Sequence, residues 1–183
     1  METKRIDDGS PLWGDFVRLY EEAFPADEKK PLSRLLALQA EEKAELLALT
    51  ENGAFAGLAA ALTGRDAAVL DYFAVRADRR GGGLGTRALG KIGARYAGRP
   101  LILEIEALDP AAGNAVQRER RRNFYLRNGL KSTGLFVRVY DTDMELLSYR
   151  PVTFEQYAAV LAETVGTGRP GWIPRQIPAP YEV

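Results

Sequence analysis

The stretch Asp78-Arg79-Arg80-Gly81-Gly82-Gly83-Leu84-Gly85-Thr86-Arg87 indicates the fold more clearly than any other part of the chain. It follows an apolar run, residues 69–75, and leads into a segment of helical character, residues 84–96. This order predicts a strand, a glycine loop and the N-terminus of a helix. Such a loop points several backbone N–H groups one way, with the positive end of the helix dipole behind them, and so favours a phosphate or pyrophosphate. A glycine-rich surface turn without a ligand is the simpler alternative.

The composition narrows the chemistry that is open to the chain. Its 183 residues suit one ordinary domain with a short tail, and 46% of them are hydrophobic, enough for a sizeable core. Cysteine and histidine are both absent, which excludes disulfides, thiol nucleophiles, Cys/His zinc sites and an imidazole base. Acid–base chemistry therefore falls to Asp, Glu, Tyr or Lys.

The charge balance and the N-terminus bear on partners and location. The 25 basic and 25 acidic residues give a net charge of zero, which argues against a dedicated nucleic-acid-binding protein. Residues 1–8 lack an apolar signal core, and no run approaches the ~20 apolar residues of a membrane span. We therefore expect a cytoplasmic protein with neither a nucleic acid nor a membrane as partner. Whether it forms a homodimer is left open.

The hydrophobic pattern predicts alternating strands and helices along one domain, residues 1–165. After an edge strand within residues 1–8, we expect helices at 11–24 and 31–40, strands at 44–50, 54–62 and 67–76, a helix at 84–97, a strand at 101–107, a helix at 115–128, a hairpin at 130–140 and 144–149, and a last helix at 153–165. Asn52-Gly53 is a strong hairpin signal, so the first three long strands form an antiparallel meander. Residues 166–183 are proline-rich, and we expect an extended or disordered tail without regular structure.

Two nucleotide motifs compete for the glycine loop. A Walker A loop needs a lysine before its hydroxyl residue, which the stretch Gly85-Thr86-Arg87 lacks. A dinucleotide fingerprint fits better, because Gly83-x-Gly85-x-x-Ala88 has the glycine spacing and Glu104 follows about twenty residues later. However, residues 76–82 separate the strand from the first glycine, and an antiparallel meander precedes the loop. Both features are foreign to a doubly wound nucleotide-binding sheet.

A third interpretation accounts for more of the chain. Arg80-Gly81-Gly82-Gly83-Leu84-Gly85 resembles the Arg/Gln-x-x-Gly-x-Gly/Ala pyrophosphate motif of the GNAT superfamily of N-acetyltransferases. The preceding Tyr72-Phe73-Ala74-Val75 resembles that family's fourth strand. Downstream, Asn123-Phe124-Tyr125-Leu126-Arg127-Asn128-Gly129-Leu130 resembles its second signature, an aromatic pair and a glycine that ends a helix, with Leu130 in place of the usual aromatic. The resemblance covers about residues 44–140.

The resemblance implies a fold and a donor. The fold would be a GNAT-type α/β (α+β) fold, with a mixed, mostly antiparallel sheet of six to seven strands, helices on both faces and an added C-terminal helix. The acyl donor would be acetyl-CoA, with no metal or further cofactor. The backbone of Phe73, Ala74 and Val75 would pair with the pantetheine amides as an added strand does. The N–H groups that would hold the pyrophosphate are those of Arg80, Gly81, Gly82, Gly83, Leu84, Gly85 and Thr86.

The chemistry implied is direct transfer of the acetyl group from the thioester to a primary amine of a small molecule or peptide. Tyr125 matches the family tyrosine that protonates the departing thiolate, and a phenol with a pKa near ~10 is a reasonable donor. The alternative for Tyr125 is a packing aromatic beside Phe124. A non-catalytic module that binds acyl-CoA, and an NAD-binding oxidoreductase, are the alternative functions.

A carboxylate should take the proton of the attacking amine. Glu104 and Glu106 alternate with apolar residues, so both should project from one face of their strand, where each can raise the pKa of the other. Glu106 is the preferred base because it lies nearer the C-terminal end of the strand, and Asp71 is held in reserve. The alternative for each is a solvated or salt-bridged carboxylate.

Two further groups of residues carry charge near these positions. Positive charge gathers around the predicted helix 115–128, on Arg118, Arg120, Arg121, Arg122, Arg127 and Lys131. We interpret it as a solvated helix face or a contact with the 3′-phosphate of CoA, rather than as a nucleic-acid site. The acceptor should meet the two N-terminal helices and the hairpin 131–150, where a cationic amine would be attracted by Glu22, Asp27, Glu28 and Tyr140.

Overall fold

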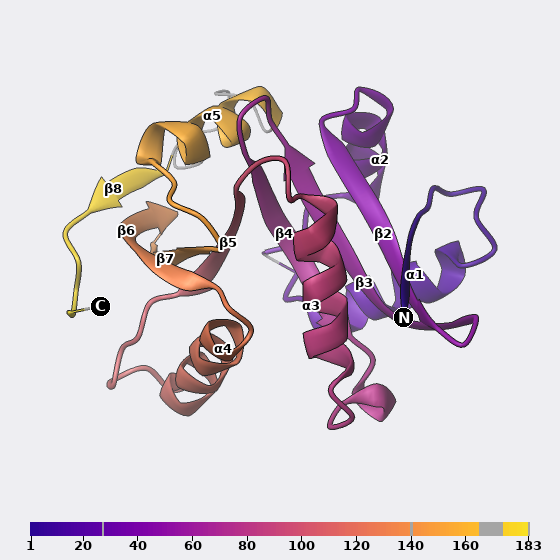
Figure 1. The fold of residues 1–183 in the computed structure, drawn as a ribbon, viewed down its shortest axis with the longest axis horizontal. Helices are drawn as coiled ribbons and strands as arrows, with labels where there is room; N and C mark the ends of the chain where they lie inside the picture. The colour runs from indigo at the N-terminus through magenta and orange to yellow at the C-terminus, as the bar shows by residue number, and fades with distance from the viewer. Residues whose placement is uncertain (27, 140, 165–173, 183) are drawn as a thin grey trace. The chain divides into compact units, whose positions relative to one another are not determined.

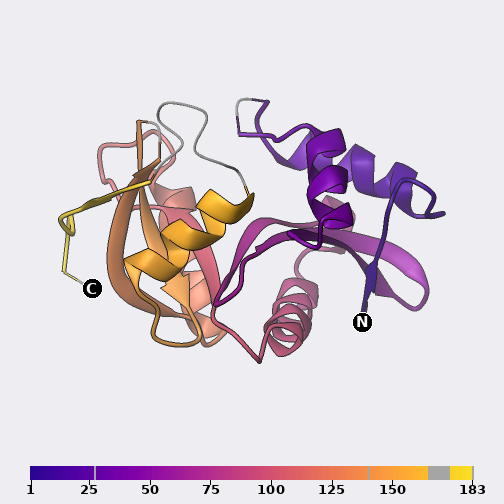
Figure 2. The ribbon, with the colours of Figure 1, turned by 90° about the horizontal axis from the view of Figure 1, so that it is seen from above.

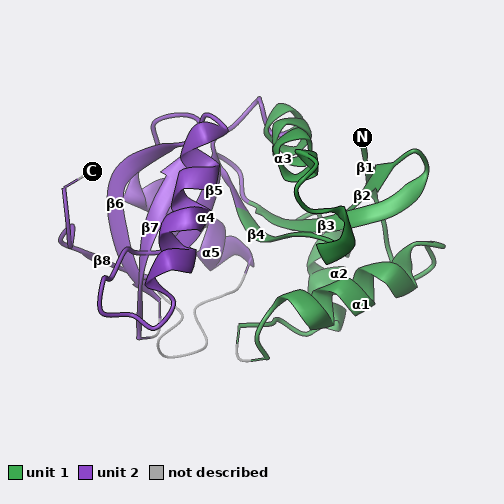
Figure 3. Ribbon diagram, turned by 90° about the horizontal axis from the view of Figure 1, so that it is seen from below, with its two compact units in different colours: residues 1–63, 70–95 green, residues 64–69, 96–183 purple. Residues whose placement is uncertain are grey.

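The computed structural model describes residues 1–26, 28–139, 141–164 and 174–182 (Figure 1). It divides into two compact units, one of residues 1–63 and 70–95 and one of residues 64–69 and 96–183 (Figure 3). The expectations for Asp27, Tyr140 and residues 166–173 lie outside the described residues. That residues 1–165 act as one domain stays a prediction.

The first unit is a four-stranded arrangement with helices on both faces. Its elements are β1 (Glu2–Arg5), α1 (Trp13–Ala23), α2 (Leu32–Ala40), β2 (Ala44–Glu51), β3 (Ala54–Thr63), β4 (Ala68–Val75, in this unit from residue 70), a 3-10 turn (Ala77–Arg79) and α3 (Leu84–Arg95). The strands lie in the order β1-β2-β3-β4, and β2 pairs antiparallel with both β1 and β3. Helices α1 and α2 cover one face, and α3 covers the other (Figure 2).

The core of this unit follows from the apolar spacing of α1. Phe16 and Tyr20, four residues apart, lie on one face of the helix and are buried against Leu58 and Tyr72 in the sheet. The helix begins at Trp13 rather than at Pro11, because Ser10 accepts a hydrogen bond from the Leu12 N–H in a turn ahead of it. The predicted hairpin is confirmed, since Asn52 and Gly53 have φ of 52° and 80°.

In its described residues, the second unit has four strands and two helices. Its elements are β5 (Leu101–Glu106), α4 (Ala115–Arg127), β6 (Lys131–Val139), β7 (Thr142–Ser148), α5 (Phe154–Thr164) and β8 (Arg175–Ile177). The strands lie in the order β5-β7-β6-β8, and each neighbouring pair is antiparallel. Helix α4 covers one face and α5 the other (Figures 2 and 3).

The α/β class is confirmed, with one correction at the C-terminus. The described residues hold five α-helices and eight strands, one strand more than the six to seven expected. The extra strand is β8, so the expectation of a tail without regular structure is wrong for residues 175–177. Pro174 and Pro178 flank this strand and leave the N–H groups between them free to pair with β6. In the described part of the chain, no helix has the length and apolar character needed to cross a membrane.

Candidate active site

The glycine loop of the first unit joins the end of β4 to α3. Gly81 and Gly83 have φ of 85° and 70°, a left-handed conformation that side-chain-bearing residues rarely adopt. A Cβ on Gly82 would meet nothing within 4 Å. The glycines therefore allow the backbone to turn here, and no described side chain covers it at Gly82.

The N–H groups of this loop divide into two sets. Arg79 and Arg80 donate theirs to the carbonyls of Arg76 and Ala77, at 3.0 and 3.3 Å, within the 3-10 turn. From residue 81 to residue 86, no N–H donates a hydrogen bond to any residue that the structure describes. These free groups lie at the N-terminus of α3, where the helix dipole favours negative charge. The predicted anion-binding set is thus Gly81 to Thr86, without the Arg80 N–H.

Arginine side chains hold the loop in shape. Arg87 donates to the Gly82 carbonyl at 2.8 Å and to Glu51 Oε1, in β2, at 2.6 Å. Arg80 donates from Nε to the Val75 carbonyl at 3.2 Å, and so ties the loop to the end of β4. These contacts come from the chain itself, and they hold the loop in a shape that suits an anion.

Asp71, the reserve base, is part of an ion pair. Both of its oxygens lie 2.8 Å from Nζ of Lys30, and the two side chains are only 12% and 13% exposed. Lys30 precedes α2, and its N–H donates to the hydroxyl of Tyr72 at 2.9 Å. The Tyr72 hydroxyl in turn donates to the Glu28 carbonyl, and burial raises the pKa of Tyr72. This is the salt-bridged alternative for Asp71, and the group fixes the loop between α1 and α2 against β4.

Tyr125 lies in the last turn of α4, in the second unit. Its ring packs edge-on against Phe124, with 5.2 Å between ring centroids. Burial raises the pKa of Tyr125 to about 12, although the nearby Arg121 lowers it. The phenol is therefore protonated at neutral pH, and its hydroxyl makes no hydrogen bond to any described residue. The hydroxyl can therefore donate its proton to a bound molecule.

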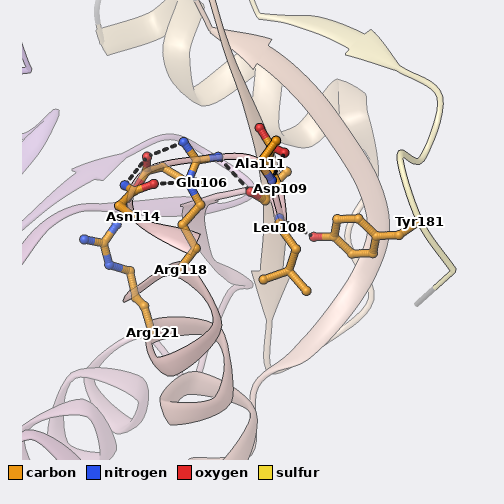
Figure 4. Close-up of polar contacts among 9 residues, drawn as sticks. Glu106, Leu108, Asp109, Ala111, Asn114, Arg118, Arg121 and Tyr181 are labelled. Atoms are coloured by element: carbon orange, nitrogen blue, oxygen red, sulfur yellow. Dashed lines mark hydrogen bonds and ion pairs between the residues drawn. The ribbon is translucent and has the colours of Figure 1, made fainter. Parts of the chain in front are cut away.

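The two carboxylates of β5 meet different helices. Glu104 Oε1 accepts a hydrogen bond from the hydroxyl of Tyr157, in α5, at 2.5 Å. Glu106 is the last residue of β5 and turns toward α4, where Arg118 and Arg121 lie 2.9 and 3.1 Å from its oxygens (Figure 4). Asn114 also donates to both Glu106 oxygens, at 3.1 and 3.3 Å. Glu106 is thus a salt-bridged carboxylate, the alternative that the sequence left open.

The basic face of α4 is largely an ion-pair network. Arg118 and Arg121 hold Glu106, and Arg122 holds Glu145 of β7 with bonds of 2.7 and 3.2 Å. The remaining basic side chains around this helix are exposed, and they are Arg120, Arg127 and Lys131. These three exposed residues are the ones left to contact the 3′-phosphate of CoA, and that contact stays a prediction.

Sequence reasoning missed two residues of this network, Glu145 and Tyr181. Glu145 is fully buried and accepts a hydrogen bond from the Tyr181 hydroxyl at 2.9 Å. An acid between apolar neighbours of a strand was a weak signal for a buried pair. Tyr181 gave no signal, because it lies in the proline-rich segment where no periodicity exists.

No group of three or more acidic side chains in the described residues could hold a metal ion. The first unit offers a loop of backbone N–H groups, which suits an anion. The second unit offers a protonated tyrosine and two carboxylates, which are groups suited to proton transfer.

Several solved structures are similar to this chain in fold. No curated protein matches the chain. A GNAT-family protein from Bacteroides thetaiotaomicron has 20% identity and a TM-score of 0.75, over 92% of this chain and 100% of that one. An aminoglycoside 6′-N-acetyltransferase complexed with coenzyme A has 17% identity and a TM-score of 0.62, over 84% and 99%. A GNAT family acetyltransferase from Elizabethkingia anophelis with acetyl-CoA bound has 16% identity and a TM-score of 0.57, over 80% and 95%.

These likenesses show the fold, and a family match goes further. The model of the acetyltransferase (GNAT) family matches residues 13–129, more than half of the chain. This span includes the glycine loop and the Phe124-Tyr125 pair on which the resemblance depended, so the predicted family is confirmed. The protein belongs to the acetyltransferase (GNAT) family.

Proposed function

We propose that this protein transfers the acetyl group of acetyl-CoA directly to a primary amine of a small molecule or peptide. The observation that carries the proposal is the row of unused N–H groups from Gly81 to Thr86 at the N-terminus of α3. A pyrophosphate is the anion that such a row fits in this family. Two solved structures of the same fold, described above, hold CoA or acetyl-CoA.

The donor contacts follow from the first unit. The pyrophosphate would accept hydrogen bonds from residues 81–86, and the pantetheine would pair with the backbone of Phe73 to Val75. Arg80 supports both contacts, because its side chain links the loop to the Val75 carbonyl. When bound, acetyl-CoA supplies the thioester that is cleaved.

The second unit supplies the proposed proton-transfer groups. In the reaction the amine nitrogen bonds to the acetyl carbon, the C–S bond breaks and CoA leaves as a thiolate. Tyr125, whose phenol is protonated at neutral pH, would give its proton to that thiolate. A carboxylate of β5, Glu106 or Glu104, would take the proton that the amine loses.

The contacts of these two carboxylates favour different roles. A general base needs a lone pair that faces the substrate, whereas Glu106 accepts hydrogen bonds from Asn114 and Arg121 and pairs with Arg118. Glu106→Gln and Glu104→Gln separate the assignments. Substitution of the residue that acts as the base should lower kcat about 100-fold or more, whereas substitution of the other glutamate should lower it much less.

Binding and turnover together test the proposal. Acetyl-CoA should raise the Tm, whereas NAD should leave it unchanged. A panel of amines, including aminoglycosides, polyamines, amino acids and peptide N-termini, should contain at least one that releases free thiol from acetyl-CoA. Stabilisation by NAD alone would refute the proposal, and binding of acetyl-CoA without transfer to any amine would favour the non-catalytic module.

Tyr125→Phe tests the acid. We expect kcat to fall about 100-fold while the affinity for acetyl-CoA stays within about threefold, because only the proton is lost. Tyr149→Phe is the matched control, since it removes the hydroxyl of another half-buried tyrosine of the same unit, which has no assigned role in proton transfer. An unchanged kcat in Tyr125→Phe would remove this residue from the mechanism.

A further inference from the structure

The hydroxyl of Tyr181 connects two segments that are distant from it in sequence. It accepts a hydrogen bond from the Leu108 N–H at 3.2 Å and donates one to Glu145 at 2.9 Å. Its ring packs edge-on against Phe136, with 5.1 Å between centroids. Burial raises the pKa of Tyr181 to about 12, so the hydroxyl keeps its proton for Glu145 at neutral pH. A residue of the C-terminal segment is thereby fixed inside the second unit.

Leu108 is the second residue of the loop that leads from β5 into α4. The preceding residue, Ala107, is held on both sides: its N–H donates to the Asp143 carbonyl at 2.8 Å, and its carbonyl accepts from Arg118 at 2.9 Å. Tyr181 adds the next contact along the chain, at the Leu108 N–H (Figure 4). The path of the backbone from Glu106 into the loop is therefore set by β7, α4 and the C-terminal segment together.

Glu145 connects the Tyr181 hydroxyl to helix α4. It is fully buried and accepts both hydrogen bonds of Arg122, which lies one turn before Tyr125 on the same side of α4. The Arg122 guanidinium also lies 5.9 Å from the centre of the Tyr181 ring. The rotation and height of α4 at Tyr125 thus depend on a buried ion pair to which the Tyr181 hydroxyl is joined.

We propose that Tyr181 is a positioning residue for acetyl transfer, which fixes α4 against β7 and the β5–α4 loop and thereby holds the Tyr125 hydroxyl in place. The inference rests on the proposed function, in which Tyr125 is the proton donor. It goes beyond the family, because Tyr181 lies outside the matched residues 13–129. Tyr181 comes from the C-terminal segment, which the family model does not match.

Tyr181→Phe tests the proposal, because it removes both hydrogen bonds and keeps the ring against Phe136. With an amine that the wild type acetylates, we expect kcat to fall about tenfold at a temperature well below the Tm of the variant, since small misplacements of reacting groups are costly. The KM for acetyl-CoA should change less than about twofold, because its proposed contacts lie in the first unit. Gln176→Ala, an exposed change in β8, should leave both constants unchanged.

A double-mutant cycle separates positioning from general damage. In a Tyr125→Phe background, the further change Tyr181→Phe should lower kcat by less than about twofold, because the hydroxyl that it positions is already gone. Equal tenfold losses in both backgrounds would overturn the proposal, as would a wild-type kcat for Tyr181→Phe alone. If the wild type itself neither binds acetyl-CoA nor releases thiol, the proposed function fails instead.

Amide hydrogen exchange of the wild-type protein provides a test that needs no folded variant. The Leu108 N–H should exchange far more slowly than that of Ala111, which is bonded only within an exposed turn. Equal and rapid exchange at both amides would show that the Tyr181 contact is not maintained in solution, and would refute the proposal. Slow exchange at Leu108 supports it.

Discussion

Gly57→Ala is the substitution whose effect the structure defines most sharply. A Cβ built on Gly57, in β3, would lie 2.5 Å from the Ala74 carbonyl oxygen, 3.1 Å from Leu49 Cδ1 and 3.3 Å from Val75 Cα. Real Cβ atoms essentially never come closer than 3.0 Å, so the methyl group would intrude by about 0.5 Å. The nearest obstacle is the backbone of β4, which cannot rotate away as a side chain can.

The cost can be estimated from that contact. Overpacking a well-packed interior costs typically ~1–3 kcal/mol, and a backbone obstacle places Gly57→Ala in the upper part of this range, about 2–3 kcal/mol. For a domain of this size each kcal/mol lowers the Tm by about 2–4 °C, so the expected loss is about 4–12 °C. Urea unfolding should show the same loss as a lower midpoint with an unchanged m-value.

The same change should also weaken the donor site. The displaced backbone, Ala74 and Val75, is the part of β4 proposed to pair with pantetheine, so we expect the affinity for acetyl-CoA to fall about tenfold. Gly90→Ala is the matched control, because it adds the same methyl group on α3, where nothing lies within 4 Å. It should stabilise the protein by ~0.5–1 kcal/mol, as alanine does in a helix interior. A Tm for Gly57→Ala equal to that of the wild type would refute the reasoning about β4.

Three further expectations follow from the other contacts. Asp71→Asn should lower the free energy of unfolding by about 3 kcal/mol, because it removes the carboxylate that is paired with a mostly buried Lys30. The double variant Asp71→Asn/Lys30→Met should lose less stability than the two single variants together, because they share one interaction, and urea unfolding of all three variants measures this. The pKa values of Tyr20, Tyr125 and Tyr181 are each raised from 10.0 to about 12, chiefly by burial, so between about pH 10 and 12 these tyrosines keep protons in the folded state that they have lost in the unfolded state. Their contribution to stability should be constant below about pH 10 and fall above it, and a free energy of unfolding that rises above about pH 10 would contradict the shifts. Finally, EDTA should leave acetyl transfer unchanged, and a loss of rate that added Mg²⁺ or Zn²⁺ restores would show a metal requirement.

Local sequence pattern was enough to place the helices, the strands other than β8 and the glycine loop. The four-residue spacing of Phe16 and Tyr20 predicted the buried face of α1, and Asn52-Gly53 predicted the β2–β3 turn. Both features depend on residues only a few positions apart, so the local sequence determines their geometry. Strand β8 escaped prediction because its pairing with β6 comes from a neighbouring strand and not from its own composition.

The side-chain pairs of the site could not be predicted in the same way. Lys30 and Asp71 are 41 residues apart, and Arg122 and Glu145 are 23 apart. In the sequence, Arg122 belonged to a helix face interpreted as solvated or as a phosphate contact, and nothing near Lys30 or Arg122 identified a partner. Only the tertiary fold decides which charges are paired, and pairing changes what a carboxylate can do.

The contrast between the glycine loop and Glu106 follows from this difference. The proposed pyrophosphate site uses backbone N–H groups from a single contiguous stretch, so its glycines and the following helix specify it almost completely. A general base instead needs a carboxylate with a lone pair directed at the substrate, and the strand pattern fixes only the position of Glu106, not its partners. Helix α4 supplies those partners, Arg118 and Arg121, from residues that had suggested a solvated face or a phosphate contact. If Glu106→Gln and Glu104→Gln both retain nearly full kcat, the proton of the amine is taken by solvent or by the acceptor itself, and the role of Glu106 is to anchor α4.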